Sequence, residues 1–178
     1  MKKSLQRAYA LTLLIMSSAV QASAGVPELI SAAVPGASKV GEARYSYLFW
    51  DVYDARLFAP QGQWEPEAAF ALALTYLRDF DGDDIAERSI KEMREQGLSD
   101  KSRIERWQST MQQIFPDVKE QDTITGIKTG EGITRFFHND KLVGEVDDPA
   151  FGEWFFNIWL GPQTTEPEFR AKLLELEE

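Results

Sequence analysis

The chain has 178 residues, a formal charge of −10, no cysteine and unusually many aromatic side chains, including 11 Phe and five Trp. The acidic balance argues against binding to nucleic acid or to an anionic membrane surface. The absence of cysteine excludes disulfides, thiolate metal sites and cysteine catalysis.

Residues 1–24 are predicted to be a cleavable signal peptide. Lys2, Lys3 and Arg7 form a positive start, and an apolar run over 8–20 follows that is too short to span a bilayer. Cleavage is predicted after Ala24, with Ala22 as the alternative. We therefore expect a periplasmic protein without a stable membrane anchor, because no later stretch is long and apolar enough to cross a membrane.

Residues 25–178 are predicted to be a single domain, because no linker or repeat divides them. Without the signal peptide, 16 basic and 29 acidic residues give a formal charge of −13. The first segment, 26–37, is expected to be an edge strand or a loop. The aromatic stretch 41–60 is predicted to be a long central strand or a tight strand pair that is covered on both faces.

The rest of the chain alternates helices and strands. Residues 69–77 favour a strand. A helix is predicted from a capping box at Asp84 and Glu87 to about Gln96, and a second one from a cap at Ser99 or Asp100 to Pro116. The pattern over 122–146 predicts a three-strand meander.

Two further helices are expected near the C-terminus. Asp147 or Asp148 caps the first, whose initial residue is Pro149, and Thr165 with Glu168 caps the second, which is expected to run to the end of the chain. The order and content of the elements indicate an α+β domain with an antiparallel sheet and helices packed on one side.

No catalytic or metal-binding constellation stands out, and neither a metal nor a cofactor is predicted. His138 is the single histidine and lies beside an expected turn, so it is interpreted as a surface residue. The acidic residues over 79–87 do not fit a calcium-binding loop, since its sixth and twelfth positions would hold Asp84 and Ile90. The glycines over 126–132 are interpreted as turn residues rather than a phosphate loop.

Many short segments, in order along the chain, carry a resemblance to a known family. They are Gly41–Arg44, Tyr47–Leu57, Tyr76–Phe80, Ile85–Ser89, Trp107, Phe115–Val118, Gly126, Gly132, Phe136–Phe137, Asp148–Phe151, Phe155–Gly161, Pro167 and Arg170. Through them the chain resembles the bacterial exported branch of the chalcone isomerase-like family. The resemblance implies an open-faced β-sandwich, in which a large antiparallel sheet carries a layer of helices and a ligand cleft lies between them.

The family includes plant enzymes that close a chalcone to a flavanone and relatives that bind fatty acids without catalysis. In both, an arginine early in the first main strand contacts the anionic part of the ligand, and Arg44 matches it by position. The catalytic members also carry a tyrosine and, seven residues later, an asparagine at the start of a helix. The matching region 83–90 has neither. A hydroxyl residue expected late in the chain is replaced by Ile158 and Trp159.

Three functions are therefore weighed. We favour a non-catalytic protein that binds a fatty acid or a similar amphipathic or aromatic small molecule. The ligand-binding residues are predicted to be Arg44, Tyr45, Phe49, Tyr53, Tyr76 and Trp107, although the helical pattern around Trp107 by itself favours a core position. The alternatives are an intramolecular lyase or isomerase for a phenolic or enone substrate, and a structural or interaction protein with a filled core. Protein partners are not predicted.

Overall fold

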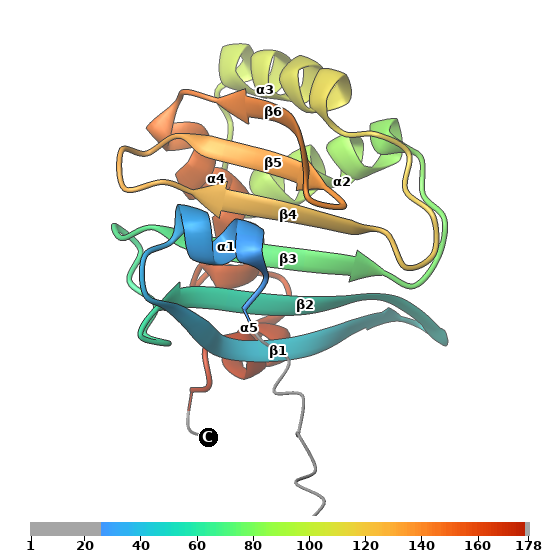
Figure 1. Ribbon diagram of the computed structural model, residues 1–178. Helices are drawn as coiled ribbons and strands as arrows, with labels where there is room; N and C mark the ends of the chain where they lie inside the picture. The colour runs from blue at the N-terminus through green and yellow to red at the C-terminus, as the bar shows by residue number, and fades with distance from the viewer. Residues whose placement is uncertain (1–25, 177–178) are drawn as a thin grey trace, which may run out of the picture.

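The computed structural model describes residues 26–176, so the predicted signal peptide lies outside the described part (Figure 1). Six strands form one antiparallel sheet in chain order: β1 (Ala37–Tyr47), β2 (Trp50–Pro60), β3 (Phe70–Tyr76), β4 (Thr123–Lys128), β5 (Thr134–His138) and β6 (Lys141–Val146). The helices are α1 (Glu28–Ala33), α2 (Gly82–Glu95), α3 (Lys101–Ile114), α4 (Pro149–Leu160) and α5 (Pro167–Leu173). The predicted α+β class and the open antiparallel sheet are confirmed.

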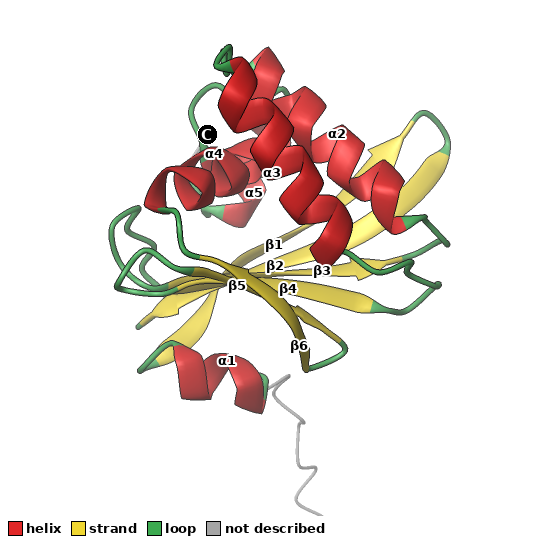
Figure 2. Cartoon of the chain, turned by 90° about the horizontal axis from the view of Figure 1, so that it is seen from above, coloured by secondary structure: helices red, strands yellow, loops and turns green. Residues whose placement is uncertain are grey.

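The sequence predicted that all helices pack on one side of the sheet, and this is wrong for one of them. In Figure 2, α2, α3, α4 and α5 cover one face, here called the inner face, and α1 lies alone against the other, the outer face. Most of the buried apolar residues pack between the inner face and its helices. Among residues 26–176, no helix combines the length and the hydropathy needed to cross a membrane.

The first segment was wrongly expected to be an edge strand or a loop. Its six helical residues are too few to be stable alone in water. They form α1 because Ile30 and Val34 are almost completely buried against Phe58 and Ile127 on the outer face. Tertiary packing, which no local pattern encodes, decides the structure here.

The aromatic stretch is a strand pair, and one of its two strands is an edge. β1 and β2 pair antiparallel from Ala37 opposite Pro60 to Tyr47 opposite Trp50. β2 also pairs with β3, whereas β1 has no second neighbour among residues 26–176, so the alternative of one long central strand is wrong. The prediction that both faces are covered fails around the turn at Leu48 and Phe49, where the side chains are exposed.

A close approach of α5 holds the inner face of β1. A Cβ atom at Gly41 would lie 2.5 Å from the carbonyl oxygens of both Lys172 and Leu173. Only glycine therefore fits this position without displacing the backbone. The contact brings α5, with Phe169, over the first two strands.

Two of the predicted caps are confirmed. The Asp100 carboxylate accepts hydrogen bonds from the amides of Ser102 and Arg103 at 2.9 and 3.1 Å. The Asp148 carboxylate accepts one from the Ala150 amide at 3.1 Å, and Pro149 is the first residue of α4. Such bonds satisfy amides that a helix leaves free at its N-terminus.

The other two caps were wrong, because more distant residues take part instead. α2 begins at Gly82, before the expected box, and the Gly82 amide donates to the Asp117 carboxylate at 3.0 Å. The Thr165 hydroxyl donates to Glu92 at 2.8 Å, while α5 begins at Pro167 and ends at Leu173 rather than at the C-terminus. Long-range contacts have replaced the local ones that the sequence pattern suggests.

Candidate functional site

A cavity of about 340 Å³ lies between the inner face of the sheet and the helices. Its size falls at the lower end of the range of roughly 300–1,000 Å³ that is usual for small-molecule sites. The lining is predominantly apolar and comes from four strands and three helices: Tyr45, Val52, Tyr53, Leu74, Tyr76, Phe80, Asp84, Ile85, Arg88, Ser89, Glu92, Phe115, Ile124, Phe155, Ile158, Trp159, Thr165, Glu166 and Phe169.

Three tyrosines on neighbouring strands form one wall. Tyr45 pairs with Tyr53, and Tyr53 pairs with Tyr76, so the three side chains lie side by side across β1, β2 and β3. The rings of Tyr45 and Tyr53 stack with centroids 5.2 Å apart, and Tyr76 meets Tyr53 edge-on at 6.1 Å. Phe169 of α5 packs edge-on against the stacked pair. This aromatic wall is rigid and amphipathic.

The tyrosine hydroxyls remain protonated at neutral pH. Burial raises the pKa of both Tyr53 and Tyr76 far above the ordinary value of 10. The pKa of Tyr45 is raised as well, first by burial and then by the carboxylate of Glu166. The Tyr53 hydroxyl accepts a hydrogen bond from the indole Nε1 of Trp159 at 2.9 Å. These groups can donate hydrogen bonds but cannot serve as bases.

Charged residues gather on the α2 side of the cavity. Arg88 forms an ion pair with Glu92, one turn further along the helix. The Glu92 side chain is only 7% exposed, and its second oxygen accepts the bond from Thr165. Asp84 and Glu166 also line the cavity. One guanidinium thus faces three carboxylates, so the polar side of the cavity is acidic.

Arg44 does not line this cavity, so the predicted contact between Arg44 and the anionic part of a ligand is corrected. Its guanidinium donates two hydrogen bonds to Asp54, at 2.7 and 2.9 Å, and one to Asp51 at 3.0 Å. Arg44 pairs with Asp54 across the strands, next to the pair of Tyr45 and Tyr53. Because neighbouring residues in a strand point to opposite faces, Arg44 lies on the outer face.

Two other predicted contacts also lie away from the cavity. Phe49 is in the β1–β2 turn, where it is 96% exposed. Trp107 is 1% exposed; it packs edge-on against Phe151 and donates from its indole nitrogen to the Asp148 carboxylate at 3.0 Å. The helical pattern had correctly favoured a core position for Trp107. Of the six predicted residues, the structure brings Tyr45, Tyr53 and Tyr76 together.

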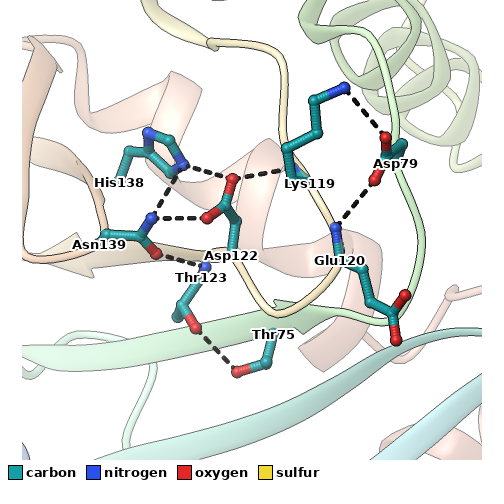
Figure 3. Close-up of polar contacts among 8 residues, drawn as sticks. All are labelled: Thr75, Asp79, Lys119, Glu120, Asp122, Thr123, His138 and Asn139. Atoms are coloured by element: carbon teal, nitrogen blue, oxygen red, sulfur yellow. Dashed lines mark hydrogen bonds and ion pairs between the residues drawn. The ribbon is translucent and has the colours of Figure 1, made fainter.

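A second polar cluster lies where the strands β4 and β5 meet their loops (Figure 3). Asp122 accepts bonds from the Asn139 side chain at 2.7 Å and from the Lys119 amide at 2.8 Å, and its carboxylate lies 3.1 Å from His138 Nε2. His138 is therefore partly buried and paired, not merely a turn residue on the surface. The nearby hydroxyls of Thr75 and Thr123 bond to each other at 2.9 Å. The cluster joins loops and presents no free nucleophile.

Because of this cluster, the folded protein is expected to lose stability at acid pH. The bonds from Asn139 and Lys119, and the proximity of His138, lower the pKa of Asp122 from 3.8 to about 2. A lowered folded-state pKa adds stability above the unfolded pKa, and this stability is lost as the pH falls from about 4 toward 2. We expect Asp122→Asn to lower the free energy of unfolding by about 1–2 kcal/mol at pH 7. Urea denaturation at pH 7, 4 and 2 measures this difference, which should shrink between pH 4 and pH 2.

The matched control for this prediction is Asp140→Asn. Asp140 is exposed in the neighbouring turn at a positive φ, a conformation that asparagine adopts readily. The free energy of unfolding of this control should stay within about 0.5 kcal/mol of the wild-type value. A deficit in Asp122→Asn that persists undiminished at pH 2 would contradict the assignment.

Among residues 26–176, no group of three or more acidic or histidine side chains is placed to hold a metal ion. The residues that sequence reasoning missed are Arg88, Glu92 and Trp159. The spacing of Arg88 and Glu92 held a usable signal, since positions 85, 88, 89 and 92 share one face of a helix.

Comparisons with known proteins agree with this geometry. Residues 40–175 match the family described as "Chalcone isomerase-like". A protein of Haemophilus influenzae described as "Uncharacterized protein" is 29% identical over 136 residues, which make up 76% of this chain and just under two thirds, 66%, of that protein. The structure of a fatty-acid binding protein of Arabidopsis thaliana aligns with a TM-score of 0.64 and 13% identity, covering 80% of this chain and 90% of that one. At that identity the likeness concerns the fold.

Proposed function

The chain belongs to the chalcone isomerase-like family, and we propose that it is an exported, non-catalytic protein that binds a fatty acid or a similar amphipathic small molecule. The observation that carries the proposal is the cavity of about 340 Å³, with its predominantly apolar lining, between sheet and helices. Export to the periplasm rests on the signal peptide predicted over residues 1–24.

The interior supports a binding role over a purely structural one. A domain with a purely structural role is expected to fill its interior with its own side chains, because every void forfeits dispersion contacts. Here Leu74, Ile124 and Phe155 border open space. The similarity in fold to the fatty-acid binding protein of Arabidopsis thaliana supports an acyl chain as the occupant.

The tyrosines and the missing family residues support binding without the catalysis of the chalcone-closing relatives. Tyr45, Tyr53 and Tyr76 are held in their protonated form and offer no base. The tyrosine and asparagine of the catalytic relatives have no counterpart over residues 83–90. An enzyme that closes a chalcone needs donors placed for a developing oxyanion. The three tyrosines are proposed to contact the apolar chain of the ligand and to hydrogen-bond its polar end.

The acidic residues of the cavity affect which polar end group the ligand can carry. A ligand carboxylate would meet Arg88, but this guanidinium is already paired with Glu92, and Asp84 and Glu166 lie nearby. Attraction to one cation is thus opposed by repulsion from three carboxylates. The affinity is therefore expected to come from burial of the chain, at about 0.8 kcal/mol for each CH₂ group.

The test uses the protein without residues 1–24. Native mass spectrometry of the protein purified from cells identifies molecules that it carries, and titration calorimetry measures the binding of palmitate and hexadecanol at pH 7.4. We expect saturable one-to-one binding of both, with hexadecanol at least as tight as palmitate, because an alcohol avoids the acidic residues. A clean apo mass together with no saturable binding of either compound would contradict the proposal.

A further inference from the structure

The turn of the β1–β2 hairpin exposes four consecutive large apolar side chains. Tyr47, Leu48, Phe49 and Trp50, here called the hairpin tip, are 59, 75, 96 and 59% exposed. The hairpin projects past the rest of the sheet, as Figures 1 and 2 show from two directions. Single exposed apolar residues are ordinary, but a contiguous group at a projecting end is not.

The backbone of the tip is strained. Leu48 has a φ of +56°, in the left-handed region that glycine or asparagine usually occupies. A bulky aliphatic residue there costs free energy and gains little burial within the described chain, since three quarters of it is exposed. Strain of this kind gathers at sites whose residues contact something outside the fold.

Charges around the tip balance, although the whole protein is acidic. The Arg78 guanidinium lies over the Trp50 ring, 4.3 Å from its centroid, and Arg44 pairs with Asp51 and Asp54 just behind the tip. The charges of these two cations and two carboxylates sum to zero. The tip is thus an apolar, locally neutral surface on a chain with a net charge of −10.

The tip lies two residues along each strand from the nearest residues that line the cavity. Moving from the turn toward the sheet, Tyr45 on β1 and Val52 on β2 line the cavity. The end of the cavity formed by Tyr45 and Val52 is therefore the end that lies toward the tip.

From these observations we propose that the hairpin tip inserts reversibly into the interface of a lipid bilayer with zwitterionic head groups. Tyrosine and tryptophan favour the head-group level of a bilayer, and phenylalanine and leucine the hydrocarbon below it. Four side chains on a turn are far fewer than the roughly 20–30 residues that each partner contributes to a stable protein interface. The net negative charge disfavours an anionic surface.

The test is flotation of the protein without residues 1–24 with vesicles of pure phosphatidylcholine. We expect the wild type to float with the vesicles, and the double variant Leu48→Ser/Phe49→Ser to bind at least tenfold more weakly. Mixing phosphatidylglycerol into the vesicles should weaken the binding of the wild type. The matched control is Leu142→Ser, which removes an exposed leucine from β6, the opposite edge of the sheet; it should float like the wild type.

Three outcomes would overturn the inference. The wild type fails to float, or the double variant floats equally well, or sedimentation velocity shows a dimer that depends on Phe49 while vesicles stay unbound. Titration of the double variant with palmitate in solution separates this test from the proposed function. The tip lies outside the cavity, so that affinity should be unchanged even when vesicle binding is lost.

Discussion

Replacing Ser89 by phenylalanine should weaken the binding of palmitate by roughly 100-fold, or about 2.7 kcal/mol, and leave the fold intact. Ser89 lines the cavity from α2, and its hydroxyl bonds only to the Ile85 carbonyl of its own helix, at 2.8 Å. A phenyl ring at this position would occupy the space that the acyl chain needs. Titration calorimetry measures the affinity, and circular dichroism the fold.

The control for this substitution is Arg44→Ala, on the outer face. Since Arg44 bonds to Asp51 and Asp54 and does not line the cavity, its removal should leave the affinity unchanged. If Ser89→Phe does not fold, Leu74→Phe obstructs the same cavity from β3. Wild-type affinity in a folded variant of either kind would show that the ligand binds elsewhere.

The second large effect is expected at Gly82, where Gly82→Ala should lower the free energy of unfolding by about 3 kcal/mol or more. A Cβ atom at this position would lie 2.2 Å from the carbonyl oxygen of Phe115, a backbone atom that cannot move aside cheaply. The same residue donates its amide to Asp117. The substitution therefore forces the start of α2 away from the loop that follows α3.

Urea denaturation measures this loss, and Gly130→Ala is the matched control. A Cβ atom at Gly130 would have open space around it, so the control should change stability by less than about 0.5 kcal/mol. Equal stabilities of the two variants would mean that the backbone around Gly82 relaxes easily. Because α2 carries Arg88, Ser89 and Glu92, such freedom would also loosen the cavity wall.

Most of the fold followed from local patterns in the sequence. The meander, the strand β3 and the caps at Asp100 and Asp148 have signals within a few residues, and the family resemblance supplied the arrangement, which the match over residues 40–175 confirms. α1 was missed because six residues become helical only through packing against the sheet. The caps of α2 and α5 were misplaced because Asp117 and Glu92 are distant in sequence.

Three of the six predicted ligand-binding residues, Tyr45, Tyr53 and Tyr76, line the cavity. The misplacement of Arg44 could have been avoided. Arg44 and Tyr45 are neighbours in a strand, so both could not face one cavity. The alternation was a sufficient reason to choose between them, whereas the resemblance in position favoured Arg44. Arg88 and Glu92 required knowledge of which face of α2 meets the sheet.

The edge strand β1 carries features that protect the protein against aggregation. Within residues 26–176, β1 is an eleven-residue edge strand, and such an edge is a template on which another chain could add a strand. β1 carries exposed charges at Lys39, Glu42 and Arg44, and its pairing with β2 shifts register twice. Charges and irregular register both hinder strand addition. Arg44, bound to Asp54 across the hairpin, is thus one of the charges that disfavour the addition of a strand to β1.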